Sequence, residues 1–130
     1  MADHPNAAFL RSLYEAFGRG DMATIDSGFA DDVTFHLPGS GPLSGDHVGK
    51  QKVFELFGKL LEGSGGTFKL EVHDVVANDD HAVGLTTNSA SRNGKDLSYH
   101  AALVAHLKNG KVAEAWEMFD DPNKVDEFWS

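Results

Sequence analysis

The side chain of His36 is a candidate for proton transfer. It lies between Phe35 and Leu37 in a strand-like segment, and an imidazole with a pKa near neutrality suits acid–base catalysis at physiological pH. A structural interpretation stands beside this one: the ring could hydrogen-bond the backbone and hold the turn at 38–39. If Leu37 faces a pocket, the alternation of a strand puts His36 on the opposite face.

Glu117 is a second candidate, near the end of the chain. It alternates with Ala115 and Phe119, and a carboxylate among apolar neighbours has its pKa raised and can act as an acid or a base. The alternative is a glutamate that faces solvent or a second subunit, with the neighbouring Trp116 facing inward. The pattern of this strand leaves both orientations open.

Two tyrosines complete the set of candidate polar groups. Tyr14 and Tyr99 could each offer a hydroxyl to a ligand, or could be core residues bonded to the backbone. The histidines do not indicate a metal site, because they form neither a His-x-x-x-His nor a His-Glu-x-x-His pattern and there is no cysteine. We therefore expect neither a metal nor another cofactor.

Composition restricts the classes of function. The chain has 130 residues, 41% of them hydrophobic, and a net charge of -9, which favours one soluble domain spanning 1–130. The lysines and arginines are scattered, so binding to nucleic acid is not expected. The apolar runs are too short for a membrane span and the N-terminal residues do not resemble a secretory signal, so we expect a cytoplasmic protein.

Three helices are expected in the first half of the chain, because apolar residues recur there at helical spacing. They cover 6–18, 21–29 and 49–62, with a strand at 33–37 after the second helix and a glycine-rich loop at 38–49. A short helix is expected in the tail, at 121–128.

Strands are expected in the second half, at 68–77, 82–91, 97–107 and 111–119. Asn-Gly pairs at 93–94 and 109–110 predict tight hairpins, so the last three strands should be antiparallel neighbours. Helices followed by an antiparallel meander predict an α+β fold with helices on one face of a curved sheet. The run 101–105 is apolar at both parities, which indicates that both faces are covered, the second by another subunit.

The order and spacing of several short motifs across 6–129 resemble the nuclear transport factor 2-like superfamily, and within it the SnoaL-like, ketosteroid-isomerase-related group. The motifs are Tyr14-Glu15-Ala16-Phe17 with Gly20-Asp21, Phe29-Ala30-Asp31-Asp32, His36-Leu37-Pro38-Gly39, Gly45 with Gly49-Lys50, Asn109-Gly110-Lys111-Val112, and Glu114-Ala115-Trp116-Glu117 with Asp120-Asp121. This resemblance implies a cup-shaped fold with a mixed sheet wrapped around helices, which hosts enzymes and non-catalytic binders alike.

The resemblance does not extend to the catalytic residues of the ketosteroid isomerases. Ketosteroid isomerases use an aspartate base, a tyrosine and a protonated aspartic acid. Alignment places these positions at Leu37, Leu13 and Leu103, and none of the three side chains can donate or accept a proton. SnoaL-type cyclases are similar in using a strand histidine and an aspartate near the last strand, for which His106 and Asp120 are the candidates.

Together these observations predict a homodimeric cup that binds a small apolar molecule. If it is an enzyme, it would be a cofactor-free isomerase, cyclase or dehydratase acting on a polyketide-, steroid- or isoprenoid-like carbonyl compound. The alternative is a non-catalytic binding or assembly module with a vestigial pocket. The expected pocket residues come from helix stripes and alternate strand positions: Tyr14, Phe17, Leu37, Phe54, Phe57, Leu85, Thr87, Tyr99, Leu103 and Phe119.

Overall fold

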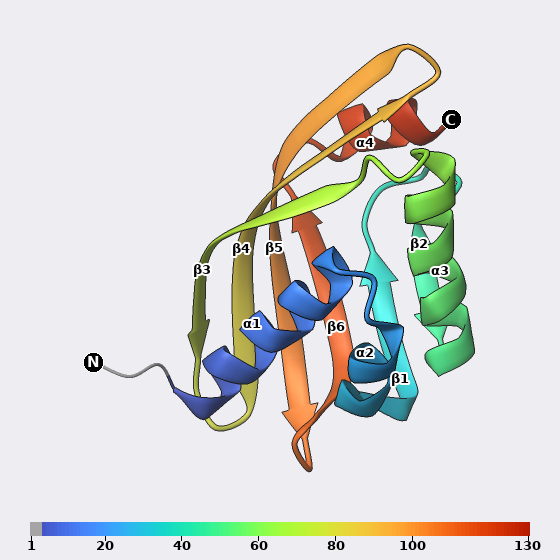
Figure 1. The fold of residues 1–130 in the computed structure, drawn as a ribbon. Helices are drawn as coiled ribbons and strands as arrows, with labels where there is room; N and C mark the ends of the chain where they lie inside the picture. The colour runs from blue at the N-terminus through green and yellow to red at the C-terminus, as the bar shows by residue number, and fades with distance from the viewer. Residues whose placement is uncertain (1–3) are drawn as a thin grey trace.

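A computed structural model describes residues 4–130, which form a curved six-stranded sheet and four helices (Figure 1). This confirms the expected α+β cup. In chain order the elements are α1 (Pro5–Gly18), α2 (Met22–Gly28), β1 (Phe29–Leu37), β2 (Gly45–Val48), α3 (Lys50–Gly63), β3 (Lys69–Ala77), β4 (His81–Arg92), β5 (Lys95–Lys108), β6 (Lys111–Phe119) and α4 (Pro122–Trp129).

The sheet is mixed, with strand order β2-β1-β6-β5-β4-β3. Strands β4, β5 and β6 are antiparallel neighbours, as the two Asn-Gly pairs predict. Asn93 and Asn109 have φ of 51° and 54° and each is followed by a glycine with positive φ, which is the backbone that a tight hairpin turn requires. Two features were not predicted: the parallel pairing of β1 with β6, and the short edge strand β2 inside the expected loop.

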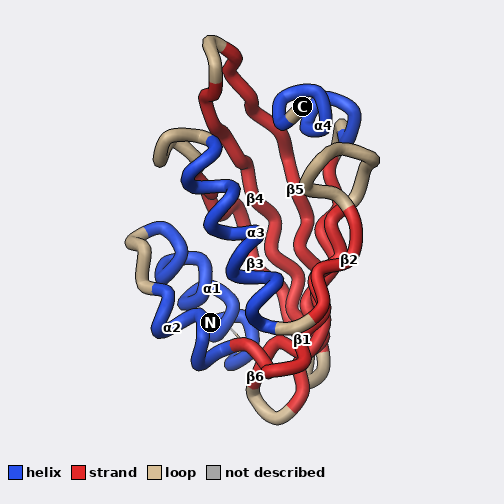
Figure 2. Tube along the Cα trace, turned by 90° about the vertical axis from the view of Figure 1, so that its right-hand side faces the viewer, coloured by secondary structure: helices blue, strands red, loops and turns tan. Residues whose placement is uncertain are grey.

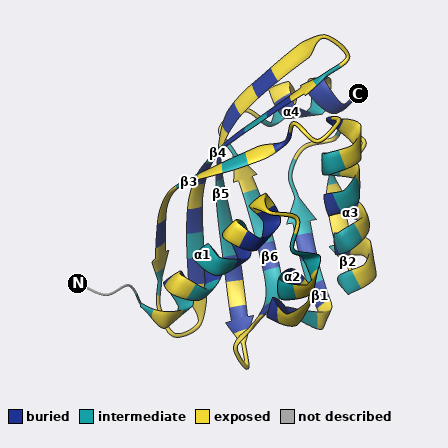
Figure 3. Ribbon diagram, viewed as in Figure 1, coloured by how far each residue is buried: buried dark blue, intermediate teal, exposed yellow. Residues whose placement is uncertain are grey.

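Helices α1 to α3 lie on one side of the sheet and α4 lies at its end (Figure 2). Local sequence fixes where several helices begin: the Asp21 carboxylate accepts from the backbone N–H of Thr24, and that of Asp121 accepts from Lys124. Along β4, buried residues alternate with more exposed ones (Figure 3). The core therefore lies between the helices and the concave face of the sheet. Within residues 4–130, no helix is long and apolar enough to cross a membrane.

A hydrogen-bonded bridge joins three strands on the convex face. His36 on β1 makes hydrogen bonds of 2.6 Å from Nδ1 to Asp46 on β2 and from Nε2 to Glu114 on β6. The bonds to Glu114 and Asp46 raise the pKa of the histidine, because both carboxylates stabilise the imidazolium. Its ring stacks on Trp116 at 5.3 Å between centroids. His36 thus connects neighbouring strands, and its hydrogen-bond partners are side chains of the sheet rather than the loop backbone expected from the sequence.

One glycine allows α1 to approach the sheet. Gly84 on β4 lies beneath the ring of Tyr14, and a Cβ at this position would lie 2.6 Å from the ring atom Cε2. Gly84 pairs with Leu103, which pairs with Glu117, so these three residues form one row across the sheet. The tyrosine ring packs on the sheet at this row. A side chain at 84 would push Tyr14 away from this row.

We expect Gly84→Ala to destabilise the fold by roughly 1–3 kcal/mol, because the rigid tyrosine ring cannot move aside cheaply. The loss should shrink by at least about 1 kcal/mol when Tyr14 is replaced by alanine, since the two positions are in contact. Urea denaturation of the four proteins in the cycle measures this coupling. Gly58→Ala is the control, because open space surrounds this α3 glycine and alanine favours a helix. Additive effects at positions 84 and 14 would contradict the contact.

Candidate functional site

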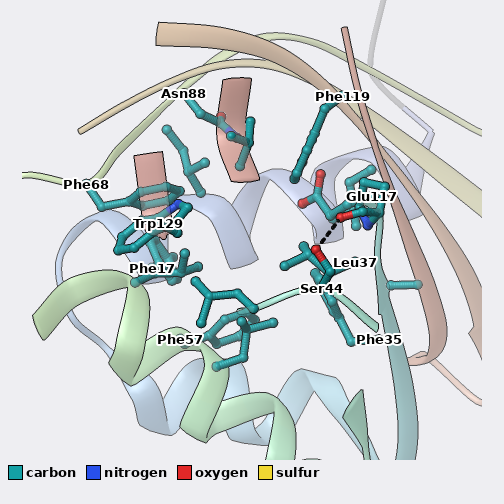
Figure 4. Close-up of a pocket in the computed structure, with 18 of the residues that line it drawn as sticks. Phe17, Phe35, Leu37, Ser44, Phe57, Phe68, Asn88, Glu117, Phe119 and Trp129 are labelled. Atoms are coloured by element: carbon teal, nitrogen blue, oxygen red, sulfur yellow. Dashed lines mark hydrogen bonds between the residues drawn. The ribbon is translucent and has the colours of Figure 1, made fainter. Parts of the chain in front are cut away.

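A cavity lies between the helices and the concave face of the sheet (Figure 4). The centre of a water-sized molecule can move within about 90 Å³ of this cavity, which is open at its mouth. Side chains of α1, α2 and α3 form one wall, and those of β1, β3, β4, β5 and β6 form the other. Helix α4 and the loop after β1 border the cavity. Most of these side chains are aromatic or aliphatic, among them Phe35, Phe57 and Leu103. The cavity is therefore suited to an apolar molecule, and its few polar groups must orient what binds.

Among the polar groups of the cavity, Glu117 is an ionisable residue with an unusual environment. It reaches the cavity from β6, and its Oε2 atom is buried with no hydrogen-bond partner among the described residues. Burial raises the pKa of this carboxyl group to about 8, because the charged form loses its hydration and gains no partner in exchange. Near neutral pH the group can thus exist in either form, which is the condition for proton transfer in both directions.

Three further polar side chains line the cavity near this carboxyl group. The Tyr14 and Tyr99 hydroxyls lie close enough to Glu117 for its charge to add to the effect of burial, which raises the pKa of both phenols. Asn88 lies opposite Tyr99 on β4, bonds to its hydroxyl, and accepts a 2.7 Å hydrogen bond from Thr86. Both phenols stay protonated at neutral pH and are available as hydrogen-bond donors.

A carboxylate from α4 holds the loop at the rim of the cavity. Asp126 Oδ2 accepts from the backbone N–H of Ser40 at 2.8 Å, and Oδ1 accepts from the Ser44 hydroxyl at 3.3 Å. Gly39 and Gly41 make this approach possible, since a Cβ on Gly41 would lie 2.8 Å from Oδ1. The rim thus consists of two segments far apart in sequence that are connected through one side chain.

Seven of the ten residues expected to form the pocket line this cavity: Tyr14, Phe17, Leu37, Phe57, Tyr99, Leu103 and Phe119. Leu85 and Thr87 do not, because Gly84, Thr86 and Asn88 occupy the concave face of β4 and put their neighbours on the convex face. Leu85 is 38% exposed there. Phe54 is also outside, at the edge of the buried stripe of α3, where it borders a shallow surface depression. These three expectations need correction.

The four expected catalytic candidates separate across the sheet. Glu117 lines the cavity, while His36, His106 and Asp120 do not. The expected pairing of His106 with Asp120 is wrong, because the register places His106 opposite Glu114. His106 instead stacks on His81, and Asp120 bonds to the ring of His100 at 3.1 Å. The pair fails because Asp120 follows β6 and lies beside His100, six positions along the chain from the residue that faces His106.

Sequence reasoning missed the polar residues Asn88, Ser44 and Asp126 and the C-terminal Trp129, which all line the cavity. An amphipathic tail helix predicts that one of its faces is covered, which could have identified Trp129. The contribution of Asp126 has no local signal, because it depends on a loop more than eighty positions away.

Comparison with known proteins places this chain in a family. The SnoaL-like domain family matches residues 10–115, most of the chain. The chain belongs to this family. It is 30% identical to an uncharacterized protein of Mycobacterium tuberculosis, over the whole of both chains. Homology and the fold thus agree with the resemblance seen in the sequence.

Solved structures show the same SnoaL-like architecture. Bal32a, from a soil-derived mobile gene cassette, is 38% identical with a TM-score of 0.94 over 96% of each chain. A protein of cystatin-like fold from Xanthomonas campestris is 31% identical with a TM-score of 0.89, over 95% of this chain and 96% of that chain. At 18% identity, the candidate polyketide cyclase IdmH from Streptomyces antibioticus shares the fold, with a TM-score of 0.76 over 94% of this chain and 96% of that chain.

We expect the stability of this SnoaL-like protein to depend on pH through Glu117. The folded state keeps the proton up to a pKa of about 8, whereas the unfolded chain loses it near 4.5. The free energy of unfolding should therefore fall between these two pH values and level off above 8. Glu117→Gln removes this term, so the variant should gain on the unmodified protein as pH rises, by on the order of a few kcal/mol in total.

Urea denaturation at several pH values measures the difference between the two proteins. The raised pKa of His36 contributes stability that is present at low pH and lost as pH rises, but it contributes equally to both proteins and cancels. Glu71→Gln is the matched control, because Glu71 is an exposed glutamate on β3. Parallel stability curves for the Glu117 variant and the unmodified protein would contradict the burial of this charge.

Proposed function

We propose that this protein binds a small apolar carbonyl compound, of polyketide, steroid or isoprenoid type, and catalyses a proton transfer on it without a cofactor. The observation that carries the proposal is the Glu117 carboxyl group, whose Oε2 atom is buried without a partner among the described residues, inside a mostly apolar cavity. A buried acid without a partner is unfavourable for folding, and sites of this kind are characteristic of catalytic acids and bases. Membership of the SnoaL-like family and the fold shared with a candidate polyketide cyclase support the same class.

The chemistry follows from the groups at the site. In its ionised form, Glu117 can remove a proton from a carbon next to the ligand carbonyl, and the electron pair of that C–H bond moves toward the carbonyl oxygen to give an enolate. The phenols of Tyr14 and Tyr99 can donate hydrogen bonds to the developing negative charge. Return of the proton from Glu117 to another atom completes an isomerisation, while cyclisation or dehydration starts from the same enolate.

The second candidate function is binding without catalysis. It is favoured by the leucines at the three positions of the ketosteroid isomerase residues, all of which line the cavity: Leu13, Leu37 and Leu103. Under this interpretation the cavity is a ligand store and the polar groups only orient the ligand. The two candidates share a ligand class and differ in whether Glu117 moves a proton.

Hydrogen exchange in a bound ketone tests the proposal. β-Tetralone has exchangeable C–H groups beside its carbonyl, and proton NMR in deuterated buffer follows their loss. We expect the protein to accelerate exchange above the buffer rate, and the acceleration to rise with pH as Glu117, with a pKa of about 8, becomes ionised. Glu117→Gln should lower the acceleration by about a hundredfold, the contribution of a positioned base.

Binding is measured separately, by the fluorescence of the neutral dye Nile red and its displacement by β-tetralone. Leu103→Trp, which places an indole ring in the cavity, should abolish dye binding, whereas Glu117→Gln should keep it. Displacement of the dye without any acceleration of exchange would favour the non-catalytic candidate. Equal acceleration by the unmodified protein and Glu117→Gln would exclude Glu117 as the base.

We also propose that two copies associate through the convex face of the sheet. Two adjacent rows of apolar side chains cross β4, β5 and β6 there and form a convex patch: Val83, Val104 and Trp116 in one row, and Leu85, Ala102 and Met118 in the other. Met118 is 54% exposed, and contiguous apolar surface of this kind is typical of interfaces. Because one patch can face its own copy across a two-fold axis, a homodimer is the simplest assembly.

Val104→Glu should convert the dimer to a monomer, because it puts a charge at the centre of the apolar convex patch. Analytical ultracentrifugation at tens of micromolar gives the mass of each protein. Lys59→Glu, on the exposed side of α3, is the control and should remain dimeric. A monomeric unmodified protein at this concentration would refute the assembly.

A further inference from the structure

Charge is distributed unevenly around the cavity. Within residues 4–130, the side chains that line it include two carboxylates, Glu117 and Asp126, and no lysine, arginine or histidine. The oxygens of Asp126 accept hydrogen bonds from Ser40 and Ser44, whereas Oε2 of Glu117 has no partner. A ligand that enters the cavity thus meets one acidic group at the rim and a second, unsatisfied one inside.

We propose that Glu117 makes the cavity selective for the charge of its ligand, so that it accepts uncharged and cationic apolar molecules and excludes carboxylates of the same shape. This inference rests on the proposed function, because it assumes that the ligand occupies this cavity. It goes further by naming the charge class of the ligand and the residue that sets it.

Desolvation is the physical basis of this selectivity. An anion loses its hydration when it enters an apolar cavity, and only a cation or several hydrogen-bond donors can compensate for that loss. Here the available donors are uncharged groups such as the phenols of Tyr14 and Tyr99 and the amide of Asn88, no cation lines the cavity among the described residues, and the facing acid becomes negative when it ionises. An uncharged carbonyl or hydroxyl group avoids this penalty and can accept a hydrogen bond from the protonated form of Glu117. An ammonium group supplies the missing partner of its ionised form.

The selectivity should change with pH. The titratable groups that face the cavity beside Glu117 are Tyr14 from α1, Tyr99 from β5 and Asp126 from α4. Both phenols keep their protons because burial raises their pKa. Between about pH 6 and about pH 9 the group that changes is therefore Glu117, whose pKa is about 8. Its ionisation adds an attraction for ammonium ligands and a repulsion for carboxylates.

A matched set of three ligands tests this inference: adamantyl methanol, adamantyl methylamine and adamantane carboxylate, which share one apolar body. Isothermal titration calorimetry at about pH 6 and about pH 9 should show the alcohol binding equally at both. The carboxylate should bind at least about tenfold more weakly than the alcohol, and the amine about tenfold more tightly at the higher pH. Nile red displacement confirms that the three ligands compete for the same cavity.

Two variants assign the effect to one side chain. Glu117→Gln should remove the dependence of amine binding on pH and should still fold, because it deletes a buried charge. The control Glu71→Gln, on the exposed side of β3, should retain the full selectivity. If carboxylate and alcohol bind equally, or if the selectivity survives in Glu117→Gln, the inference is overturned while ligand binding stands. If neither dye nor any of the three ligands binds, the proposed function fails and the inference with it.

Discussion

Removing the Glu117 carboxyl group from water without giving it a partner is unfavourable for folding, and much of the surrounding structure keeps that group in place. Gly84 lets the Tyr14 ring pack against the sheet at the row of paired residues that contains Glu117. The aromatic residues of α1, α3 and β1 exclude water, with Phe17, Phe35 and Phe57 in edge-to-face contact. These contacts fix the wall of the cavity, so the pKa of the carboxyl group is set by the fold rather than by any local bond.

Strand alternation separates the chemistry of the two faces. On β6, Glu117 faces the cavity, while Glu114 and Trp116 face the other side and hold His36. The same carboxyl chemistry thus has opposite consequences three residues apart. On the convex face, Glu114 favours the protonated form of His36, whereas inside the cavity the Glu117 carboxyl group has its own pKa raised by burial. A shift of register by one residue would exchange these environments, which gives the hairpin at 109–110 a direct effect on the site.

Sequence reasoning predicted the fold well because its signals are local. The helical stripes, the acidic caps and the two Asn-Gly turns each depend on a few adjacent residues, and they define the helices and the β4–β6 meander. It failed where neighbours in space decide. Leu85 resembles a core residue, but the need for a small residue beneath Tyr14 puts Gly84 on the concave face instead. The partners of Asp120 and Asp126, and the orientation of Glu117, likewise depend on register and on distant loops.

The requirements of the fold are therefore separable from those of any chemistry in the cavity of this SnoaL-like protein. The cup needs small residues where helices approach the sheet, apolar walls and tight turns, and many sequences can supply these. The chemistry depends on which of the inward-facing positions carry polar groups. Leucines occupy the positions at which the sequence resemblance places the ketosteroid isomerase residues, and the ionisable group of the cavity enters from β6 instead. A carboxyl group at this different place can still reach a ligand in the same cavity, because side chains from five strands and four helices converge there. If the acidic residue occupies a different position in the wall while the cavity is kept, one fold can support different reactions.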